Sequence, residues 1–361
     1  MGKILIYPLT DTVGGVEEYE MNLIRYSPQK IADGYGYVVL GDKSPYVNEL
    51  TGHDVHYFIL PKKEKLIKSV IGTYKLFGSL RGEYDTLYFN TSAIGYIVPY
   101  LCAIHFKYRI ALHSHLDGTY ISSQFKKIVQ RINYQIIKKH ISVKLACSMS
   151  AAKWLFCGDM DSVHIIPNAI DLQRFKFDND VRKQIRQDMC IEDSIVIGNV
   201  SRLTEVKNQN FLIDLVNEML KHGDDVKLLL VGDGEDKESL VKRVEEYGIQ
   251  EKVIFYGRTS TPERIMNAMD CIVLPSLTEG FPISIIEAQA AGLKCILSDT
   301  VTKEVNVTGD VTYLSLGDPL AKWEDEILKL NYARSDNYET LEKRGFDVNG
   351  LEAYVSQVIS E

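Results

Sequence analysis

The sequence lacks several signals that define common functional classes. No strand-like run is followed by a GxGxxG fingerprint, which argues against a dinucleotide-dependent dehydrogenase. The 6 cysteines are scattered without a pair at metal-ligand spacing, and several lie in apolar runs typical of buried thiols in a reducing compartment. The chain also has no internal repeat and no low-complexity tract. We therefore predict a globular protein without a cysteine metal site.

Long hydrophobic runs are nearly absent as well. The longest uncharged stretch, residues 86–106, is interrupted by Asn90, Gly95, Pro99 and His105. These interruptions favour a buried strand followed by a buried helix over a membrane span. The start, MGKILIYPLT, has no small-residue cleavage site and is interpreted as a first strand rather than a signal peptide. We expect a cytoplasmic protein.

The composition is that of a globular protein, with 45% hydrophobic and 25% charged residues in a chain of 361. That length exceeds one compact core and suits two domains. The net charge of -8 is unevenly divided, because residues 1–170 carry 19 Lys and Arg against 14 Asp and Glu, and the rest carry 22 against 35. A basic front part suits an anionic partner, such as a membrane surface or a phosphorylated acceptor, and argues against nucleic-acid binding.

Strand-like and helix-like segments alternate along the whole chain. Seven apolar runs between residues 2 and 170 and six between residues 195 and 316 predict strands, with helical patterns between several of them. Such alternation predicts an α/β fold of two doubly wound, Rossmann-like domains facing one another across a cleft. We place the first domain at 1–175, a linker at 176–193 and the second domain at 194–340. A C-terminal helix within 341–361 is expected to pack back toward the first domain.

The segment EGFPISIIEAQAAG, residues 279–292, carries two glutamates in otherwise apolar or small surroundings. Pro282 is placed as the first residue of a helix and Gly292 as its end, so Glu279 precedes the helix and Glu287 lies inside it. A buried strand precedes this segment, so the order is that of a ligand-binding strand end in a doubly wound sheet. The alternative is two solvated glutamates, one favourable to the helix dipole and one on its exposed side.

Other polar residues and glycines follow predicted strands. Gly14 and Gly15 lie between the first strand and a helix expected to begin near Glu17, where glycine lets the backbone approach a ligand, although a simple turn explains them as well. Arg202 and Lys207 lie in the loop after the first strand of the second domain. Two cations there suit a diphosphate, whereas ordinary solvated side chains are the alternative.

Several segments in their spacing resemble the retaining GT-B glycosyltransferases of the family-four type: GGVEEY, IPNAIDLQRF, IGNVSRLTEVKNQNFLIDLV, LLLVGDGED, VIFYG and IVLPSLTEGFPISIIEAQAAGLKCILSD. The resemblance covers the second domain almost continuously and is strongest to bacterial enzymes that build capsule, exopolysaccharide or O-antigen on a lipid diphosphate. It implies a GT-B-like fold, a nucleotide-sugar donor, expected to be a UDP-sugar, in the second domain, and a saccharide or lipid-linked acceptor in the first.

The resemblance also implies roles for individual residues. Arg202 and Lys207 would bind the donor diphosphate, Glu279 the sugar hydroxyls and Glu287 the ribose hydroxyls. Backbone of the segment Gly280, Phe281 and Pro282 would face the sugar and phosphate, and Gly15 would close over the phosphates. A carboxylate is a good acceptor for paired hydroxyls, so the two glutamates would hold different ends of one ligand.

RIALHSHLDG, residues 109–118, resembles the strand-end histidine segment that approaches the transferred sugar in related enzymes. Leu116 stands where many relatives with this pattern have Asn, so His113 and His115 both stay candidates, and a satisfied core histidine is the alternative. The pair Asp159 and Asp161 superficially matches a metal-binding DxD motif, but its place in a loop favours a solvated turn.

The chemistry expected from these residues requires neither a metal nor another cofactor. Arg202, Lys207 and two helix N-termini would stabilise the departing diphosphate. Because no residue is an obvious nucleophile, we expect displacement with retention, in which the leaving phosphate helps to take the acceptor proton. Two alternatives stay open: a nucleotide-sugar epimerase of the same architecture, and a catalytically silent homologue that serves as a binding partner.

Two stretches combine lysines with apolar residues. Residues 57–80 carry Lys62, Lys63, Lys65, Lys68 and Lys75 among Leu, Ile, Val and Phe, and FKKIVQRINYQIIKKH repeats the combination. A basic amphipathic stretch can lie on an anionic membrane, although a solvated helix face is the alternative. We expect peripheral attachment to the inner face of the plasma membrane.

Overall fold

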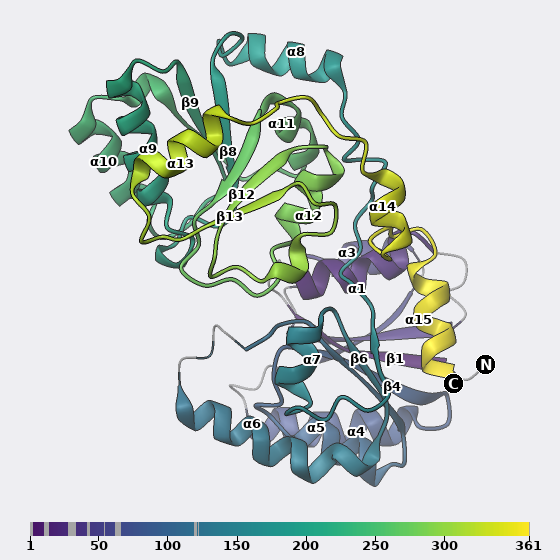
Figure 1. The fold of residues 1–361 in the computed structure, drawn as a ribbon. Helices are drawn as coiled ribbons and strands as arrows, with labels where there is room; N and C mark the ends of the chain where they lie inside the picture. Colours follow the sequence, from purple (N-terminus) through teal and green to yellow (C-terminus); the bar gives the residue numbers. More distant parts are fainter. Residues whose placement is uncertain are drawn as a thin grey trace. The chain divides into compact units, whose positions relative to one another are not determined.

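A computed structural model describes residues 3–10, 14–27, 34–41, 44–53, 55–61, 66–118, 121 and 123–360 (Figure 1). Lys62, Lys63 and Lys65 of the first basic stretch lie outside the described residues. The chain divides into two compact units, Met1–Ile170 with Gly345–Glu361, and Asp171–Arg344. Each unit is described below by itself.

The first unit is built on a seven-stranded sheet in which every pairing is parallel. Its strands are β1 (Lys3–Leu9), β2 (Tyr35–Leu40), β3 (His56–Leu60), β4 (Tyr84–Thr91), β5 (Arg109–Ser114), β6 (Ile141–Ala146) and β7 (Val163–Ile165). The order β3-β2-β1-β4-β5-β6-β7 reverses direction between β1 and β4. That reversal is the switch point of a doubly wound sheet, where ligands bind at the carboxyl ends of the strands.

Helices cover both faces of this sheet and form two apolar layers. One face packs against α1 (Gly15–Arg25), α3 (Val47–Gly52) and α15 (Leu351–Ser360), and the other against α4 (Leu66–Leu80), α5 (Val98–His105), α6 (Gln124–Ile137) and α7 (Met149–Leu155) (Figure 1). A short helix, η1 (Lys138–His140), follows α6. Helix α1 begins two residues before the expected start at Glu17, because extended Gly14 is its N-cap.

The C-terminal helix belongs to the first unit. Leu351, Val355 and Val358 of α15 lie in the same apolar layer as β1 and α1. The hydroxyl of Tyr35 on β2 bonds to Ser356, and it donates to Glu352 Oε1 at 3.3 Å. These contacts hold α15 on the sheet.

The second unit contains a six-stranded sheet in which all pairings are again parallel. Its strands are β8 (Ile195–Val200), β9 (Val226–Val231), β10 (Val253–Gly257), β11 (Cys271–Leu274), β12 (Lys294–Ser298) and β13 (Val311–Leu314). The order β10-β9-β8-β11-β12-β13 places the switch point between β8 and β11. The prediction of two doubly wound, Rossmann-like α/β domains is confirmed, because strands covered on both faces read as continuous apolar runs in the sequence.

Seven α-helices described in the second unit accompany this sheet: α8 (Asn179–Asp188), α9 (Gln209–His222), α10 (Lys237–Tyr247), α11 (Pro262–Ala268), α12 (Ile283–Ala290), α13 (Leu320–Leu328) and α14 (Tyr338–Lys343). Their core includes the fully buried Trp323, whose ring meets Phe211 edge-on with centroids 4.9 Å apart.

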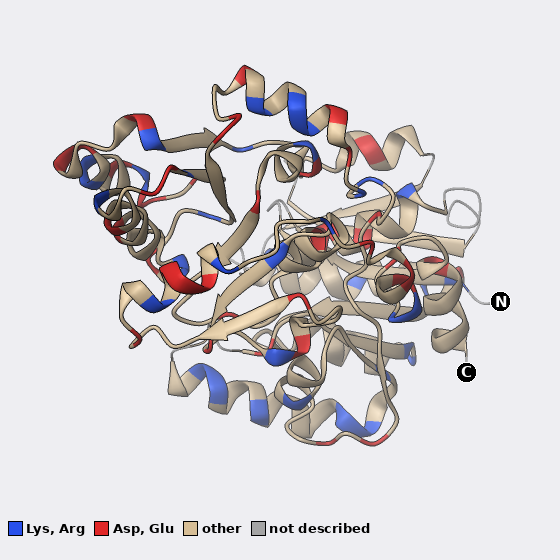
Figure 2. Ribbon diagram, turned by 45° about the horizontal axis from the view of Figure 1, so that its top comes forward, with Lys and Arg blue, Asp and Glu red and all other residues tan. Residues whose placement is uncertain are grey.

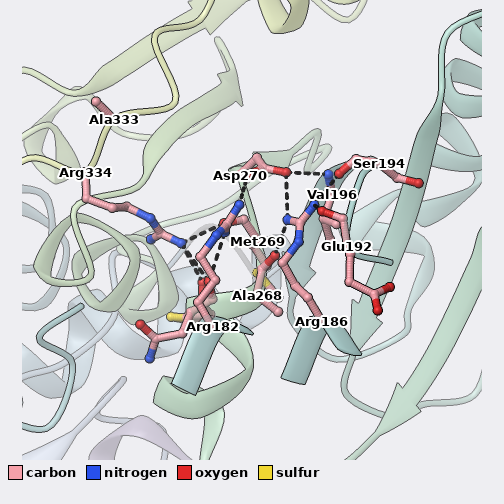
Figure 3. A network of polar contacts seen from close by, with 12 residues as sticks. Arg182, Arg186, Glu192, Ser194, Val196, Ala268, Met269, Asp270, Ala333 and Arg334 are labelled. Atoms are coloured by element: carbon pink, nitrogen blue, oxygen red, sulfur yellow. Dashed lines mark hydrogen bonds and ion pairs between the residues drawn. The ribbon is translucent and has the colours of Figure 1, made fainter. Parts of the chain in front are cut away.

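Helix α8 lies within residues 176–193 and is fastened to the second unit by arginines (Figure 3). Arg182 and Arg186 form ion pairs with opposite oxygens of the buried Asp270, which also accepts from the backbone N–H of Val196 at 2.7 Å. Arg334 donates to the carbonyls of Met266, Asn267 and Met269. Burial and neighbouring positive charge lower the pKa of Arg334 to about 9. Charge-assisted bonds of this kind are stronger than neutral ones.

Within the described ranges, no helix has the length and apolar character needed to cross a membrane. Of the cysteines, Cys102, Cys147, Cys271 and Cys295 are buried, as the apolar runs around them predict. Asp159 of the aspartate pair accepts from Lys144 Nζ at 2.8 Å and from the Tyr134 hydroxyl at 2.7 Å. Both oxygens of the Asp159 carboxylate therefore accept from protein groups, one from a lysine and one from a tyrosine.

Candidate functional site

The loops that leave β8 and β11 meet at the switch point of the second sheet. Asn208, at the end of the β8 loop, adopts left-handed backbone with φ 55° and donates from Nδ2 to the carbonyl of Pro275 at 3.1 Å. The N–H of Leu277 donates to the carbonyl of Val206 at 2.8 Å. Two bonds between the loops fix their relative position, which gives the side chains on them a defined geometry.

Lys207 and Glu279 are brought together by these loops. Lys207 ends the short helix η2 (Glu205–Lys207), and its ammonium forms an ion pair with Glu279 Oε2. The two side chains are only 17% and 7% exposed. Backbone bridging between Glu279 and Val301, which follows β12, holds the glutamate in place. A cation and a carboxylate that are nearly desolvated at a strand end have the chemistry of an anion or hydroxyl site.

Arg202 lies on the same β8 loop but is oriented differently. Its guanidinium is 3.1 Å from Glu235 Oε2, and the two side chains are 68% and 60% exposed. An exposed pair of this kind contributes at most about 1 kcal/mol, so Arg202 is readily released to a stronger anion. Arg202 and Lys207 therefore lie on one loop, but Arg202 pairs with Glu235 and Lys207 pairs with Glu279.

Glycines in the β9 loop position the backbone around Arg202. A Cβ at Gly232 would lie 2.0 Å from the carbonyl oxygen of Ser201, and one at Gly234 would lie 2.0 Å from that of Leu203. The N–H of Leu203 donates to the carbonyl of Asp233 at 3.1 Å. The glycines in LVGDGED thus serve loop-to-loop packing, a role that was missed in the sequence.

The helix after Glu279 begins one residue later than predicted. Pro282 is the N-cap of α12 rather than its first residue, because its ψ of 108° is extended. Gly292 follows the C-cap with φ +70°, and a Cβ there would lie 2.3 Å from the carbonyl oxygen of Ser335, so the predicted end is confirmed. Glu287 lies half-buried on α12, while Gly280 and Pro282 are buried and Phe281 is half-buried.

In the first unit, Gly15 is the first residue of α1, at the carboxyl end of β1. A Cβ at this position would meet nothing within 4 Å, and Gly15 itself is exposed. Neither packing nor backbone conformation in the described protein therefore requires glycine here. A ligand approaching the free N–H groups at the start of α1 would supply such a requirement.

His113 and His115 are both fully enclosed at the end of β5. His115 Nδ1 is 3.0 Å from Asn168 Oδ1 and its Nε2 is 2.9 Å from Asn90 Oδ1. His113 Nδ1 is 2.6 Å from the Tyr88 hydroxyl, whereas its Nε2 has no hydrogen-bond partner among the described residues. Burial lowers the pKa of His115 to about 4, and burial together with His115 lowers the pKa of His113 well below its usual value. Both rings are therefore neutral at neutral pH.

Two buried residues of α1, Tyr19 and Glu20, were not among the site residues predicted from the sequence. Tyr19 of α1 contacts both rings, with centroids 5.0 Å from His113 and 4.8 Å from His115, and its hydroxyl is 2.8 Å from that of Tyr88. Glu20, next to Tyr19, is completely buried, and the side chain of Asn90 is its polar neighbour. Burial, followed by the charge of Glu17, raises the pKa of Glu20 well above its usual value. Asn90 and Asn168 could have been found from the sequence only because they are polar residues at the ends of predicted strands.

The predicted residues thus fall into two sets, one in each unit. Lys207, Glu279 and the start of α12 occupy the switch point of the second sheet, with Arg202 on the same loop. Gly15 and the histidines occupy the carboxyl edge of the first sheet. In the part of the chain that the structure describes, no group of three or more His, Cys, Asp or Glu side chains is placed to hold a metal ion.

Comparison with known proteins adds family information. Residues 181–314 match the family model named Glycosyl transferases group 1. The chain is 28% identical over 349 residues to the "Putative glycosyltransferase EpsF" of Bacillus subtilis (strain 168), covering 92% of this chain and 90% of that protein. It is 27% identical over 252 residues, 65% of this chain and 62% of the relative, to an Escherichia coli protein named UDP-Gal:alpha-D-GlcNAc-diphosphoundecaprenol alpha-1,3-galactosyltransferase.

Solved structures agree on the architecture. Alr3699/HepE of Anabaena, crystallised with UDP, superposes with a TM-score of 0.82 at 20% identity and covers 99% of both chains. Sucrose-phosphate synthase of Thermosynechococcus elongatus superposes with a TM-score of 0.74 at 18% identity, covering 99% of this chain and 98% of that one. The chain has the GT-B glycosyltransferase fold. The matched residues 181–314 lie in the unit that holds Lys207 and Glu279.

Proposed function

We propose that this chain is a retaining hexosyltransferase that moves a sugar from a UDP-sugar to a saccharide or lipid-linked acceptor in the synthesis of cell-surface polysaccharide. The group 1 match supports transfer of a glycosyl group. The Escherichia coli relative supports the donor and acceptor classes, because its name specifies UDP-Gal and a diphosphoundecaprenol-linked sugar. Complexes of the Anabaena protein with UDP and with UDP-glucose support a uridine nucleotide.

One observation carries the proposal: the ion pair of Lys207 and Glu279 at the switch point of the second sheet. A donor diphosphate bound at the start of α12 would take the ammonium as its counter-ion. Glu279 would then accept hydrogen bonds from hydroxyls of the transferred sugar. Glu287, a turn farther along α12, would accept from the ribose hydroxyls.

The proposed reaction breaks the bond between the anomeric carbon and the diphosphate oxygen. Negative charge on the leaving group grows in the transition state, where Lys207, Arg202 and the helix N–H groups stabilise it more than in the ground state. Retention follows if the acceptor attacks from the face that the diphosphate leaves and gives its proton to a departing phosphate oxygen. These fixed cations and dipoles supply the charge that a divalent ion supplies elsewhere, so we propose turnover without a metal.

In the first unit, we propose that the edge of the sheet that contains Gly15 and His113 also binds ligand. Gly15 would admit the donor phosphates close to the α1 backbone. His113 is the better candidate of the two histidines for the sugar, because both nitrogens of His115 already face asparagines.

The test is product analysis with the full chain. Incubation with a panel of UDP-sugars should release UDP and free sugar slowly. Addition of an acceptor should give a glycoside at a higher rate. NMR of this glycoside should show the same anomeric configuration as in the donor. EDTA should not abolish the reaction. A product that is another UDP-sugar would identify an epimerase instead, and an absence of both UDP binding and turnover across the panel would leave a silent homologue.

A further inference from the structure

Helix α6 of the first unit carries apolar residues on its exposed side as well as on its buried side. Its inward side holds Tyr134 and Ile137 together with the amides of Gln130 and Asn133, which bind the backbone of residue 94. The exposed residues recur every three or four positions: Phe125, Ile128, Ile132 and Ile136, of which Phe125 is 74% exposed. Surface helices normally bury such a stripe.

Helix α4 has the same feature on the same face of the sheet. It buries Phe77 and Leu80 along with Ser69 and Thr73, and its exposed side carries Ile67, Ile71 and Tyr74, with Ile67 74% exposed. Leu101 of α5, a third helix on this face, is exposed as well. We name these three helices the outer layer; they cover the sheet face opposite α1, α3 and α15 (Figure 1). Scattered apolar residues on a surface are normal, but aligned stripes on two helices of one layer indicate a binding face.

The charges of the outer layer have one sign. Helices α4, α5 and α6 contain no Asp or Glu, and residues 118–158 contain none either. Basic residues border the apolar stripes: Lys68 and Lys75 on α4, Lys126, Lys127 and Arg131 on α6, and Lys138 and Lys139 directly after it. Figure 2 shows the blue bands of Lys and Arg on α6, at its lower left. Arg131, Ile132 and Ile136 also line a shallow surface depression, so cationic and apolar groups are adjacent there.

We infer that the outer layer is a docking surface for an anionic lipid bilayer, with Phe125, Ile128, Ile132 and Ile136 entering the headgroup boundary and the lysines binding lipid phosphates. A basic amphipathic helix lying in the interface has this distribution of residues. Two stripes in one helix layer with a basic border fit a plane of negative charge. A second protein chain fits less well, because lysine is depleted at protein–protein interfaces.

Membrane docking of this face goes beyond the proposed transfer reaction and is independent of it. The residues concerned are remote in sequence from Lys207, Glu279 and Arg202, so changes to them leave UDP binding as an internal control for folding.

The test is flotation of the full chain with vesicles of phosphatidylcholine alone or mixed with phosphatidylglycerol, at low and high salt. The wild type should float with anionic vesicles at low salt only. Ile128→Ser with Ile132→Ser should lower the partition coefficient at least about tenfold, because each buried CH₂ contributes about 0.8 kcal/mol. Lys126→Gln with Arg131→Gln should lower it on the order of tenfold or more, at about 1 kcal/mol per charge.

The matched control is Leu328→Ser with Lys242→Gln, an exposed apolar and an exposed basic residue of the second unit. It should float like the wild type. Equal flotation with neutral and anionic vesicles, or unchanged flotation of the two outer-layer variants, overturns the inference. So does a wild-type dimer in sedimentation equilibrium that the serine variant converts to a monomer in the absence of vesicle binding, since a second copy would then cover the face.

Discussion

The ammonium of Lys207 is ion-paired with the carboxylate of Glu279 across the two loops that meet at the switch point of the second sheet. Both groups are largely shielded from water, so each depends on the other for compensation of its charge. Any anion that binds here competes with Glu279 for the same cation. The site is therefore already organised around a positive charge that a bound phosphate group would share with Glu279.

Removing one member of this pair should destabilise the protein more than removing both. Lys207→Met leaves a nearly buried carboxylate without its cation, which costs about 3 kcal/mol for a buried pair and less here because Lys207 is partly exposed. Lys207→Met with Glu279→Gln restores neutrality and should recover most of that loss. Thermal unfolding of the single and double variants measures it. Equal melting temperatures for both would show that the pair carries no net electrostatic coupling.

The two glutamates should separate by ligand. Glu287→Ala should weaken UDP and the UDP-sugar alike, because both contain the ribose, by about ten- to a hundredfold for a charge-assisted bond of about 1.5–3 kcal/mol. Glu279→Ala should not weaken UDP, since it frees Lys207, but it should lower kcat by a similar factor. Calorimetric titration and initial rates measure the two effects. Loss of UDP affinity in Glu279→Ala would reverse the assignment.

Arg202 and Lys207 should contribute to ligand affinity through the phosphate groups of the ligand. Arg202→Ala and Lys207→Ala should weaken UDP far more than uridine, and should depress turnover because leaving-group charge peaks in the transition state. Lys242→Ala, an exposed lysine of α10, is the matched control and should change neither. Titrations with UDP and with uridine at one salt concentration measure the difference. An equal loss of affinity for both ligands would show that these side chains do not bind the diphosphate.

Gly15 offers a clean separation of function from stability. Because a Cβ there meets nothing within 4 Å, Gly15→Ala should leave the melting temperature unchanged or slightly raised while lowering kcat/KM. Gly292→Ala is the contrasting variant, since its Cβ would collide with the backbone of Ser335, and it should unfold at lower temperature. Unimpaired turnover of Gly15→Ala would remove this residue from the site.

Glu20 should make stability depend on pH. Its pKa is raised in the folded protein, so folding is opposed increasingly as pH rises from the unfolded value of about 4.3 toward the folded one. Glu20→Gln removes that penalty and should raise the melting temperature at pH 8, with a smaller gain at pH 5 and none near pH 4. Scans at the three values measure the trend. A gain that is constant with pH would contradict burial of an ionisable group at this position.

Much of the fold could be predicted because the physics is local. Strands such as CIVL and VKLLLV are apolar on both faces, and the alternation with helical patterns fixes a parallel sheet. Contacts between distant residues had no such signal. No local pattern indicates that Lys207 is paired with Glu279, or that Glu20 is completely buried, because tertiary packing decides both. Pro282 was placed one residue too far into its helix, since proline is compatible with both the N-cap and the first turn.

Fastening of α8 by Arg182 and Arg186 determines where the chain can be divided for experiments on separate pieces. A fragment beginning at residue 194 would discard both arginines and leave Asp270 buried without them. One beginning at residue 171 and ending at residue 344 keeps α8 and the Arg334 segment with the sheet they cover. Expression trials of the isolated second unit should therefore begin at residue 171, upstream of α8.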